Sequence, residues 1–252
     1  MTLRSWRDCD RSEARESMSA TGAASTSQPG LAVVGRDLFK IYKEGRSETV
    51  ALRGADLSVD AGEFVSLMGP SGSGKSTLLS ILAGLTTPSA GEVVVDGQDL
   101  SDLDEPGRAR WRADRVGLVF QRGNLIPFLS AEENVVLVAR RRAGLRRAKQ
   151  RARELLEALA LGDRMRHRPG ELSGGEVQRA GIAVAVANEP AMLLGDEVTG
   201  ELDSATSEHV METLLDLRRE RGLTMVLVTH NRAIAALADR QLEITGGLVQ
   251  QR

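Results

Sequence analysis

From Leu31 onwards, short apolar runs rich in β-branched residues alternate with helical patterns along the chain. The apolar runs predict strands at residues 50–59, 64–68, 91–95, 116–120, 191–194 and 224–228. The pattern that follows the second of these runs predicts a helix at residues 75–85. Because strands alternate with helices, the pattern favours a largely parallel sheet flanked by helices. We therefore expect an α/β fold.

A helix-rich stretch interrupts this alternation after the strand at residues 116–120 and before a helix that begins near Gly175. One apolar helix face in this stretch is predicted at Ala148, Ala152, Leu155, Leu156 and Leu159. The opposite face is predicted to carry Arg146, Arg147, Lys149, Arg151 and Arg153. A solvated face is favoured over a contact surface for an acidic partner or lipid headgroups, because acidic residues follow directly. We expect an inserted helical subdomain at about residues 122–174.

The first 30 residues differ from the rest of the chain, because they lack apolar periodicity and end in a Ser, Gln, Pro and Gly-rich run. We expect residues 1–30 to form a disordered extension and residues 31–252 to form the folded domain. Hydrophobic residues make up 41% and charged residues 27% of the chain, which is ordinary for a folded soluble domain. The single cysteine, Cys9, allows no internal disulfide.

Charge and hydropathy narrow the possible partners and the location. The formal net charge of -2 gives no long-range attraction to phosphodiester backbones, so no nucleic acid partner is expected. No run approaches the roughly 20 apolar residues needed to span a bilayer, and the N-terminus lacks the apolar stretch of a secretory signal. We expect the chain to stay in the cytoplasm.

A glycine-rich loop with a lysine, a serine and a threonine lies between the strand at residues 64–68 and the following helix. Its glycines let successive N–H groups face a β-phosphate, where the helix N-terminus adds partial positive charge. Lys75 would bind the β- and γ-phosphates, and Ser76 would offer its hydroxyl to Mg²⁺. A tight turn alone would require neither the lysine nor the strand-to-helix context. The loop comprises Gly69, Pro70, Ser71, Gly72, Ser73, Gly74, Lys75, Ser76 and Thr77.

Two adjacent acids, Asp196 and Glu197, follow the apolar run at residues 191–194. A strand that ends there would bring both carboxylates to the sheet edge beside the phosphate loop. Asp196 would then hold Mg²⁺, and Glu197 would polarise the attacking water as a general base. An acid pair after a strand is by itself more often a turn with solvated charges, so this interpretation depends on the phosphate loop.

A second candidate anion site combines Ser173, Gly174 and Gly175 at the start of a helix. Taken alone, Ser173 could simply cap the helix. The run from Leu172 to Glu176, followed by Gln178 and Arg179, resembles the signature sequence of the ABC ATPases. The resemblance spans about residues 31–251. It implies a phosphate-loop, RecA-like core with an antiparallel β subdomain and an inserted helical subdomain.

In the ABC ATPases the signature contacts ATP held by the opposite subunit, so the resemblance implies a head-to-tail dimer of two copies around ATP. It also implies roles for residues elsewhere in the chain. Tyr42 would stack on adenine, although a lone tyrosine after a strand is otherwise most often a packing residue. Gln121 would sense Mg²⁺ and water, Asp203 would communicate across the dimer, and His230 would hydrogen-bond the γ-phosphate.

Within the family, segments 121–127 and 130–135, together with 69–74 and 199–203, look most like the macrolide-export and lipoprotein-release group. Four positions depart from the family pattern. Val198 replaces a proline, Glu201 a common asparagine, Val177 a common glutamine and Val184 an arginine. Without proline at position 198, we expect a less restricted Glu197 loop and slower hydrolysis.

These features predict an ATP-hydrolysing subunit, bound peripherally to the inner face of the membrane through a separate permease. Two alternatives remain at this point. One is a non-transport ABC ATPase switch that regulates an envelope complex or acts as a soluble factor. The other is an ATP-dependent dimerisation module without turnover, and the presence of Glu197 argues against it.

Overall fold

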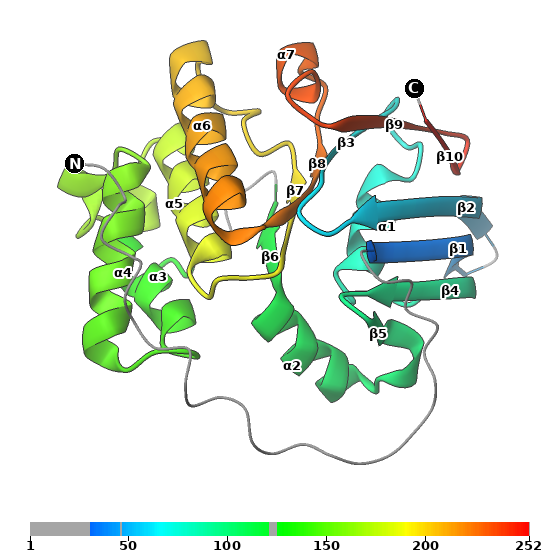
Figure 1. Ribbon diagram of the computed structural model, residues 1–252, viewed down its shortest axis with the longest axis horizontal. Coiled ribbons are helices and arrows are strands. Elements are labelled where there is room, and N and C mark those ends of the chain that lie inside the picture. Colours follow the sequence, from blue (N-terminus) through cyan, green and yellow to red (C-terminus); the bar gives the residue numbers. More distant parts are fainter. Residues whose placement is uncertain (1–30, 46, 121–124, 252) are drawn as a thin grey trace.

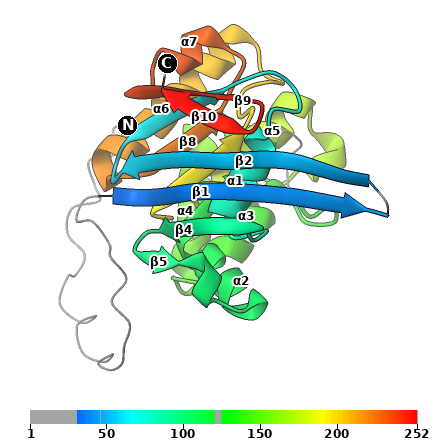
Figure 2. The same cartoon turned by 90° about the vertical axis from the view of Figure 1, so that its right-hand side faces the viewer.

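The computed structural model describes residues 31–45, 47–120 and 125–251, which form two sheets and the helices around them (Figure 1). The predicted extension at residues 1–30 lies outside this part of the chain. An antiparallel four-stranded sheet has the order β2-β1-β4-β5. Its strands are β1 (Leu31–Glu44), β2 (Ser47–Asp60), β4 (Ala90–Val95) and β5 (Gln98–Asp99). Figure 2 shows β1 and β2 running side by side across one face of the molecule.

The second sheet has six strands in the order β10-β9-β3-β8-β7-β6. Its strands from β9 to β6 are parallel, and β10 pairs antiparallel with β9. The predicted α/β fold with an antiparallel β subdomain is therefore confirmed. The strands are β3 (Phe64–Met68), β6 (Val116–Val119), β7 (Met192–Asp196), β8 (Thr224–Val228), β9 (Arg240–Thr245) and β10 (Leu248–Gln251).

The central strands β3, β7 and β8 are buried on both faces, and successive residues of β8 point into different hydrophobic clusters. Met225 and Leu227 pack with residues of α3, α4, α5 and α6. Val226 and Val228 pack with residues of α1 and the antiparallel sheet. Continuous apolar strands of this kind are typical of parallel sheets covered on both sides. The helices are α1 (Lys75–Leu82), α2 (Glu105–Arg115), α3 (Ala131–Ala139), α4 (Leu145–Ala158), α5 (Gly174–Val186), α6 (Ser204–Arg221) and α7 (Arg232–Ala235).

Most predicted element boundaries lie within three residues of the observed ones, and those of β3 and β8 coincide. The first helix, predicted to reach residue 85, ends at Leu82 because Gly84 adopts a left-handed conformation with φ +63°. No strand was predicted at β1. Its pairing with β2 shifts register near Gly35 and Leu38, so the strict alternation that marks a strand is broken there.

Residues 125–171 fold as α3, α4 and the single-turn 3₁₀ helices η3 (Gly162–Arg164) and η4 (Pro169–Glu171). Ser130 begins α3 with a capping box, because its hydroxyl accepts from the Glu133 N–H and the Glu133 carboxylate accepts from the Ser130 N–H. Among the described residues, none of the helices has the length and apolar character of a membrane span.

The predicted apolar face of α4 is confirmed, since all five of its members are buried. The assignment of Arg151 to the opposite, solvated face is wrong, because Arg151 is only 9% exposed. Position 151 lies three residues after Ala148 and four before Leu155, a spacing that places it on the apolar face. The Arg151 guanidinium therefore needs hydrogen-bond and ion-pair partners inside the protein.

Arg151 ties α4 to the segment that follows α5. Its Nε donates to the Ala187 carbonyl at 2.6 Å and its Nη2 to the Val186 carbonyl at 2.8 Å. Its Nη1 lies 3.0 Å from a carboxylate oxygen of Glu189, and this carboxylate also pairs with Arg221 at the end of α6. Burial lowers the pKa of the Arg151 guanidinium to about 10, so it stays charged at neutral pH.

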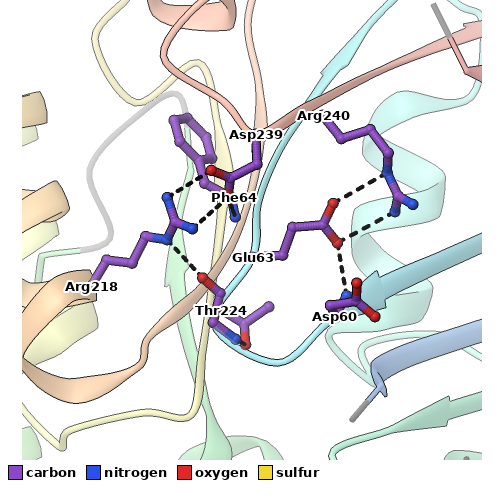
Figure 3. Close-up of polar contacts among 8 residues, drawn as sticks. Asp60, Glu63, Phe64, Arg218, Thr224, Asp239 and Arg240 are labelled. Carbon is purple, nitrogen blue, oxygen red and sulfur yellow. Dashed lines mark hydrogen bonds and ion pairs between the residues drawn. The ribbon is translucent and has the colours of Figure 1, made fainter.

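Polar contacts also fix the amino ends of the parallel strands, as Figure 3 shows. Arg218 of α6 pairs with Asp239, and the Asp239 carboxylate accepts the Phe64 N–H at the start of β3 at 2.8 Å. Next to it, Glu63 pairs with Arg240 at 3.2 Å. The phosphate loop follows the carboxyl end of β3, so this network lies at the opposite edge of the sheet from it. We infer that this network stabilises the fold and takes no part in nucleotide binding.

We predict that Arg151→Met lowers the free energy of unfolding by about 2–4 kcal/mol, because two buried carbonyls lose their donors and Glu189 loses a partner. Urea denaturation monitored by circular dichroism measures the change. Arg146→Met, on the exposed side of the same helix, is the matched control and should change stability by about 0.5 kcal/mol or less. Equal effects of the two substitutions would contradict the role assigned to Arg151.

Candidate nucleotide site

The phosphate loop leaves the carboxyl end of β3 and leads directly into α1. Gly74 is the N-cap of α1 with φ +109°, and a Cβ on it would stand 2.5 Å from the Ala51 carbonyl oxygen. A Cβ on Gly69 would stand 2.2 Å from the Ile244 carbonyl oxygen. Both positions therefore require glycine, and the backbone of the loop is held tightly against β2 and β9.

The side chains of the loop fit a phosphate group. Lys75 is buried, and its Nζ donates to the carbonyls of Gly69 at 2.9 Å and Pro70 at 2.7 Å, which holds the ammonium above the loop. The Ser73 hydroxyl is buried and has no hydrogen-bond partner among the described residues. A buried, unpaired hydroxyl is costly, and an acceptor oxygen of a bound phosphate would satisfy it.

Ser76 and Asp196 meet at this edge, although 120 residues separate them in the sequence. The Ser76 hydroxyl donates to Asp196 Oδ2 at 2.7 Å. The prediction that the acidic strand end lies beside the phosphate loop is thus confirmed. A hydroxyl and a carboxylate oxygen are ligands that suit Mg²⁺, which also retains water and substrate oxygens. Gln121, the third predicted metal residue, lies outside the described residues.

Glu197 and His230 also lie together, with Glu197 Oε1 2.9 Å from His230 Nε2. Both side chains reach solvent, and the Glu197 carboxyl is the more buried of the two, at 25% exposure. Glu197 has a left-handed φ of +52°, which is strained for a residue with a side chain. Its N–H donates to the Val228 carbonyl and its own carbonyl accepts from Gly200, each at 3.0 Å, so the strained turn is held at both ends.

Val198 restrains the same turn by packing. Its side chain is buried, and a Cβ on Gly195 would stand 2.2 Å from Val198 Cγ2. The Val198 carbonyl accepts from the amide of Gln178 at 3.1 Å. These contacts supply a restraint that the absent proline would otherwise give. The expected slowing of hydrolysis stays a prediction.

The signature turn, residues 173–175, begins α5. Ser173 is its N-cap in a capping box, because its Oγ accepts from the Glu176 N–H at 3.3 Å and its N–H donates to the Glu176 carboxylate at 2.8 Å. These bonds and the neighbouring Arg164 lower the pKa of Glu176 to about 2. Capping and anion binding are compatible, since the first turn of a helix leaves several N–H groups without intrahelical acceptors.

The signature turn packs against the aspartate loop, residues 199–203. A Cβ on Gly174 would stand 2.8 Å from Glu201 Oε2, and one on Gly175 would stand 3.1 Å from Leu202 Cδ2. Asp203 caps α6 by accepting from the Thr206 N–H at 2.9 Å and the Thr206 hydroxyl at 2.6 Å, and these bonds lower the pKa of its carboxyl. The sequence predicted a dimer contact for Asp203 and missed this cap.

Tyr42, the predicted adenine-stacking residue, lies on β1 with its side chain exposed, and the Lys40 ammonium is 5.2 Å from the centroid of its ring. Neither Tyr42 nor Asp203 bonds to the phosphate loop in the part of the chain that the structure describes. The resemblance to the signature sequence includes Gln178 but implies no role for it. It is buried and also lies 3.4 Å from the Phe120 carbonyl, so it joins α5 to the end of β6 and to the Glu197 turn.

This geometry defines a phosphate-loop ATPase that has a second glycine-containing turn, the signature turn, at the N-terminus of α5. Residues 52–200 match the family model described as ABC transporter, and the chain belongs to that family. It is 47% identical to the lipoprotein-releasing system ATP-binding protein LolD of Xylella fastidiosa over 221 residues, which cover 87% of this chain and 92% of that protein. The chain is thus an ATP-binding and ATP-hydrolysing subunit of an ABC transporter.

Two further relatives support this placement. The macrolide export ATP-binding/permease protein MacB of Marinobacter nauticus is 46% identical over 214 residues, which cover 84% of this chain but only 33% of that longer protein. The ATP-binding cassette MJ0796, solved as a dimer in a post-hydrolysis state with ADP and phosphate, is 41% identical. The two structures agree with a TM-score of 0.84 over 87% of this chain and 97% of that one.

We predict that Glu197→Gln lowers the ATP turnover number by about 10²–10⁴-fold, or roughly 3–5.5 kcal/mol of barrier, because an amide cannot take the proton of the attacking water. Nucleotide affinity should be retained, since the phosphate loop is untouched. Phosphate release and nucleotide titration measure the two quantities. Glu212→Gln, at an exposed position of α6, is the control, and turnover of Glu197→Gln equal to that control would refute the assignment.

Proposed function

We propose that this chain powers a permease of the lipoprotein-release and macrolide-export type, by closing as a head-to-tail dimer around ATP and opening after hydrolysis. The observation that carries the proposal is the match to the ATP-binding protein of a lipoprotein-releasing system over nearly its whole length. The match to MacB covers a third of a protein named as a macrolide export ATP-binding/permease protein. Through its permease, the chain would lie at the inner face of the membrane.

In this proposal, different residues around the phosphate loop would bind Mg²⁺, bind the phosphates and accept the proton of the attacking water. Ser76 and Asp196 would hold Mg²⁺, which supplies charge neutralisation at the phosphates, and Gln121 would complete that set. Lys75 would turn from the loop carbonyls towards the phosphate oxygens. Glu197 would accept a proton from the attacking water, while His230 would hydrogen-bond the γ-phosphate. The 2.9 Å contact between these two side chains keeps the histidine beside the base.

The second half of each site would come from the other copy. The signature turn begins α5 and packs against the aspartate loop, whereas the phosphate loop lies between β3 and α1. The N–H groups of the signature turn and the hydroxyl of Ser173 would take the γ-phosphate of ATP held by the partner. Tyr42 would stack on the adenine of the copy's own nucleotide, and Asp203 would face the dimer interface.

A mixing experiment tests the shared site. Lys75→Ala should abolish ATP binding but keep its signature turn intact. Ser173→Asp should keep the helix cap, because aspartate caps as well as serine, while its charge repels the phosphate. Each variant should be inactive alone. Mixed one to one, they should recover up to about a quarter of the parental turnover, because half of the dimers are mixed and each of these holds one complete site.

Turnover of the mixture equal to the sum of the two separate variants would contradict a site shared between copies. Full turnover of the parent as a strict monomer, measured by ultracentrifugation under assay conditions, would contradict it as well. Thermal unfolding of both variants serves as the control that their folds are intact.

A second prediction concerns the permease. The chain should co-purify with a membrane protein that has few spans and a large outer domain, encoded in a neighbouring reading frame, and its ATPase rate should change on binding. Membrane extracts from cells that express both proteins, with a tag on the ATPase, provide the test. If the chain binds no membrane protein in such extracts, the proposed coupling to a permease of this type is contradicted.

A further inference from the structure

An acidic side chain lies against Gly174 of the signature turn. Glu201 Oε2 stands 2.8 Å from the position that a Cβ on Gly174 would occupy. Gly174 is the first residue of α5, and Ser173 is its cap. This carboxylate therefore lies beside the turn to which, in the proposed function, the partner's γ-phosphate would bind.

Glu201 differs from the other carboxylate of the turn. Glu176 accepts the Ser173 N–H and pairs with Arg164 at 3.0 Å, so its charge is offset by donors. Glu201 is exposed, and no hydrogen bond or ion pair to it occurs within the described residues. Arg179 is a further cation beside the turn, with its Nη1 3.8 Å from the Cβ position of Gly175, and no ion pair between Arg179 and Glu201 occurs within the described residues.

We propose that Glu201 opposes binding of the γ-phosphate at the signature turn and thereby sets the ATP concentration at which two copies close. This inference rests on the proposed function, because it requires the turn to receive ATP from the partner. Like charges separated by a few ångströms repel strongly when closure excludes water from between them. Since the dimer holds two such sites, the repulsion acts twice in each closure.

Glu201 thus tunes the affinity of the signature turn for ATP without taking part in the chemistry. It contacts the signature turn and none of Lys75, Glu197 or His230 through a hydrogen bond or ion pair in the described part of the chain. Its removal should therefore change the ATP dependence of closure and of turnover more than the rate at saturating ATP. A change in ATP dependence without a change in the saturated rate would distinguish Glu201 from a residue that supports the fold.

The test uses Glu197→Gln as the background, so that ATP is bound but hydrolysed slowly. The ATP concentration that gives half-maximal dimer is measured by analytical ultracentrifugation with and without Glu201→Gln. We expect the added substitution to lower this concentration about tenfold at low salt, equivalent to about 1.4 kcal/mol per site. At high salt the difference should shrink below about twofold, because ions screen the charge.

Two further variants act as controls in the same background. Glu212→Gln removes the same charge from an exposed position of α6 and should leave the ATP concentration for half-maximal dimer unchanged. Glu201→Asp keeps the charge and should stay close to the background protein. A separate measurement of turnover with Glu197 intact should show a lower KM for Glu201→Gln and a similar kcat.

The outcomes separate the inference from the function on which it rests. A dimer whose ATP dependence is the same with and without the Glu201→Gln substitution, or is shifted equally by Glu212→Gln, would overturn the inference and leave the proposed function standing. If the Glu197→Gln protein forms no dimer with ATP at all, the proposed function fails and the inference fails with it.

Discussion

The parallel register of β3, β8 and β7 is the constraint on which the nucleotide site depends. Leu67 pairs with Val228, and Val228 pairs with Asp196, so the carboxyl ends of the three strands stand side by side. The loops that leave these ends must therefore share one edge of the sheet. This is why Ser76 can donate to Asp196 across 120 residues of sequence, and why His230, after β8, reaches Glu197. A shift of β7 relative to β3 and β8 would disrupt both contacts.

The turn that carries the base is held by contacts from several elements. Glu197 adopts a left-handed conformation, and hydrogen bonds to its neighbours in β8 and in its own loop maintain it. Val198 packs into the core behind it, while Gln178 of α5 binds the Val198 carbonyl. The same helix starts at the signature turn. Movement of α5 relative to the sheet would therefore act on the base and on the second phosphate site together.

The five carboxylates of the site differ in their hydrogen-bond partners, and these partners determine the role of each carboxylate. Glu176 and Asp203 are both engaged by helix-capping hydrogen bonds, which lower the pKa of each carboxyl and assign it a structural task. Asp196 accepts the Ser76 hydroxyl, and Glu197 faces His230. Glu201 has none of these arrangements, so its charge acts on whatever approaches the signature turn. Residue type alone does not separate these five carboxylates.

The sequence by itself determined the phosphate loop, the acid pair and the signature turn, because each is a short run whose spacing and glycines fix the local backbone. It also determined the α/β class and the bounds of β3 and β8, which are short, predominantly apolar runs that are buried along their whole length. Only the tertiary structure decided the bulged β1, the carbonyls and the Glu189 carboxylate that surround Arg151, and the position of Glu201 beside Gly174. These features depend on which distant segments pack together, and no local pattern records that packing.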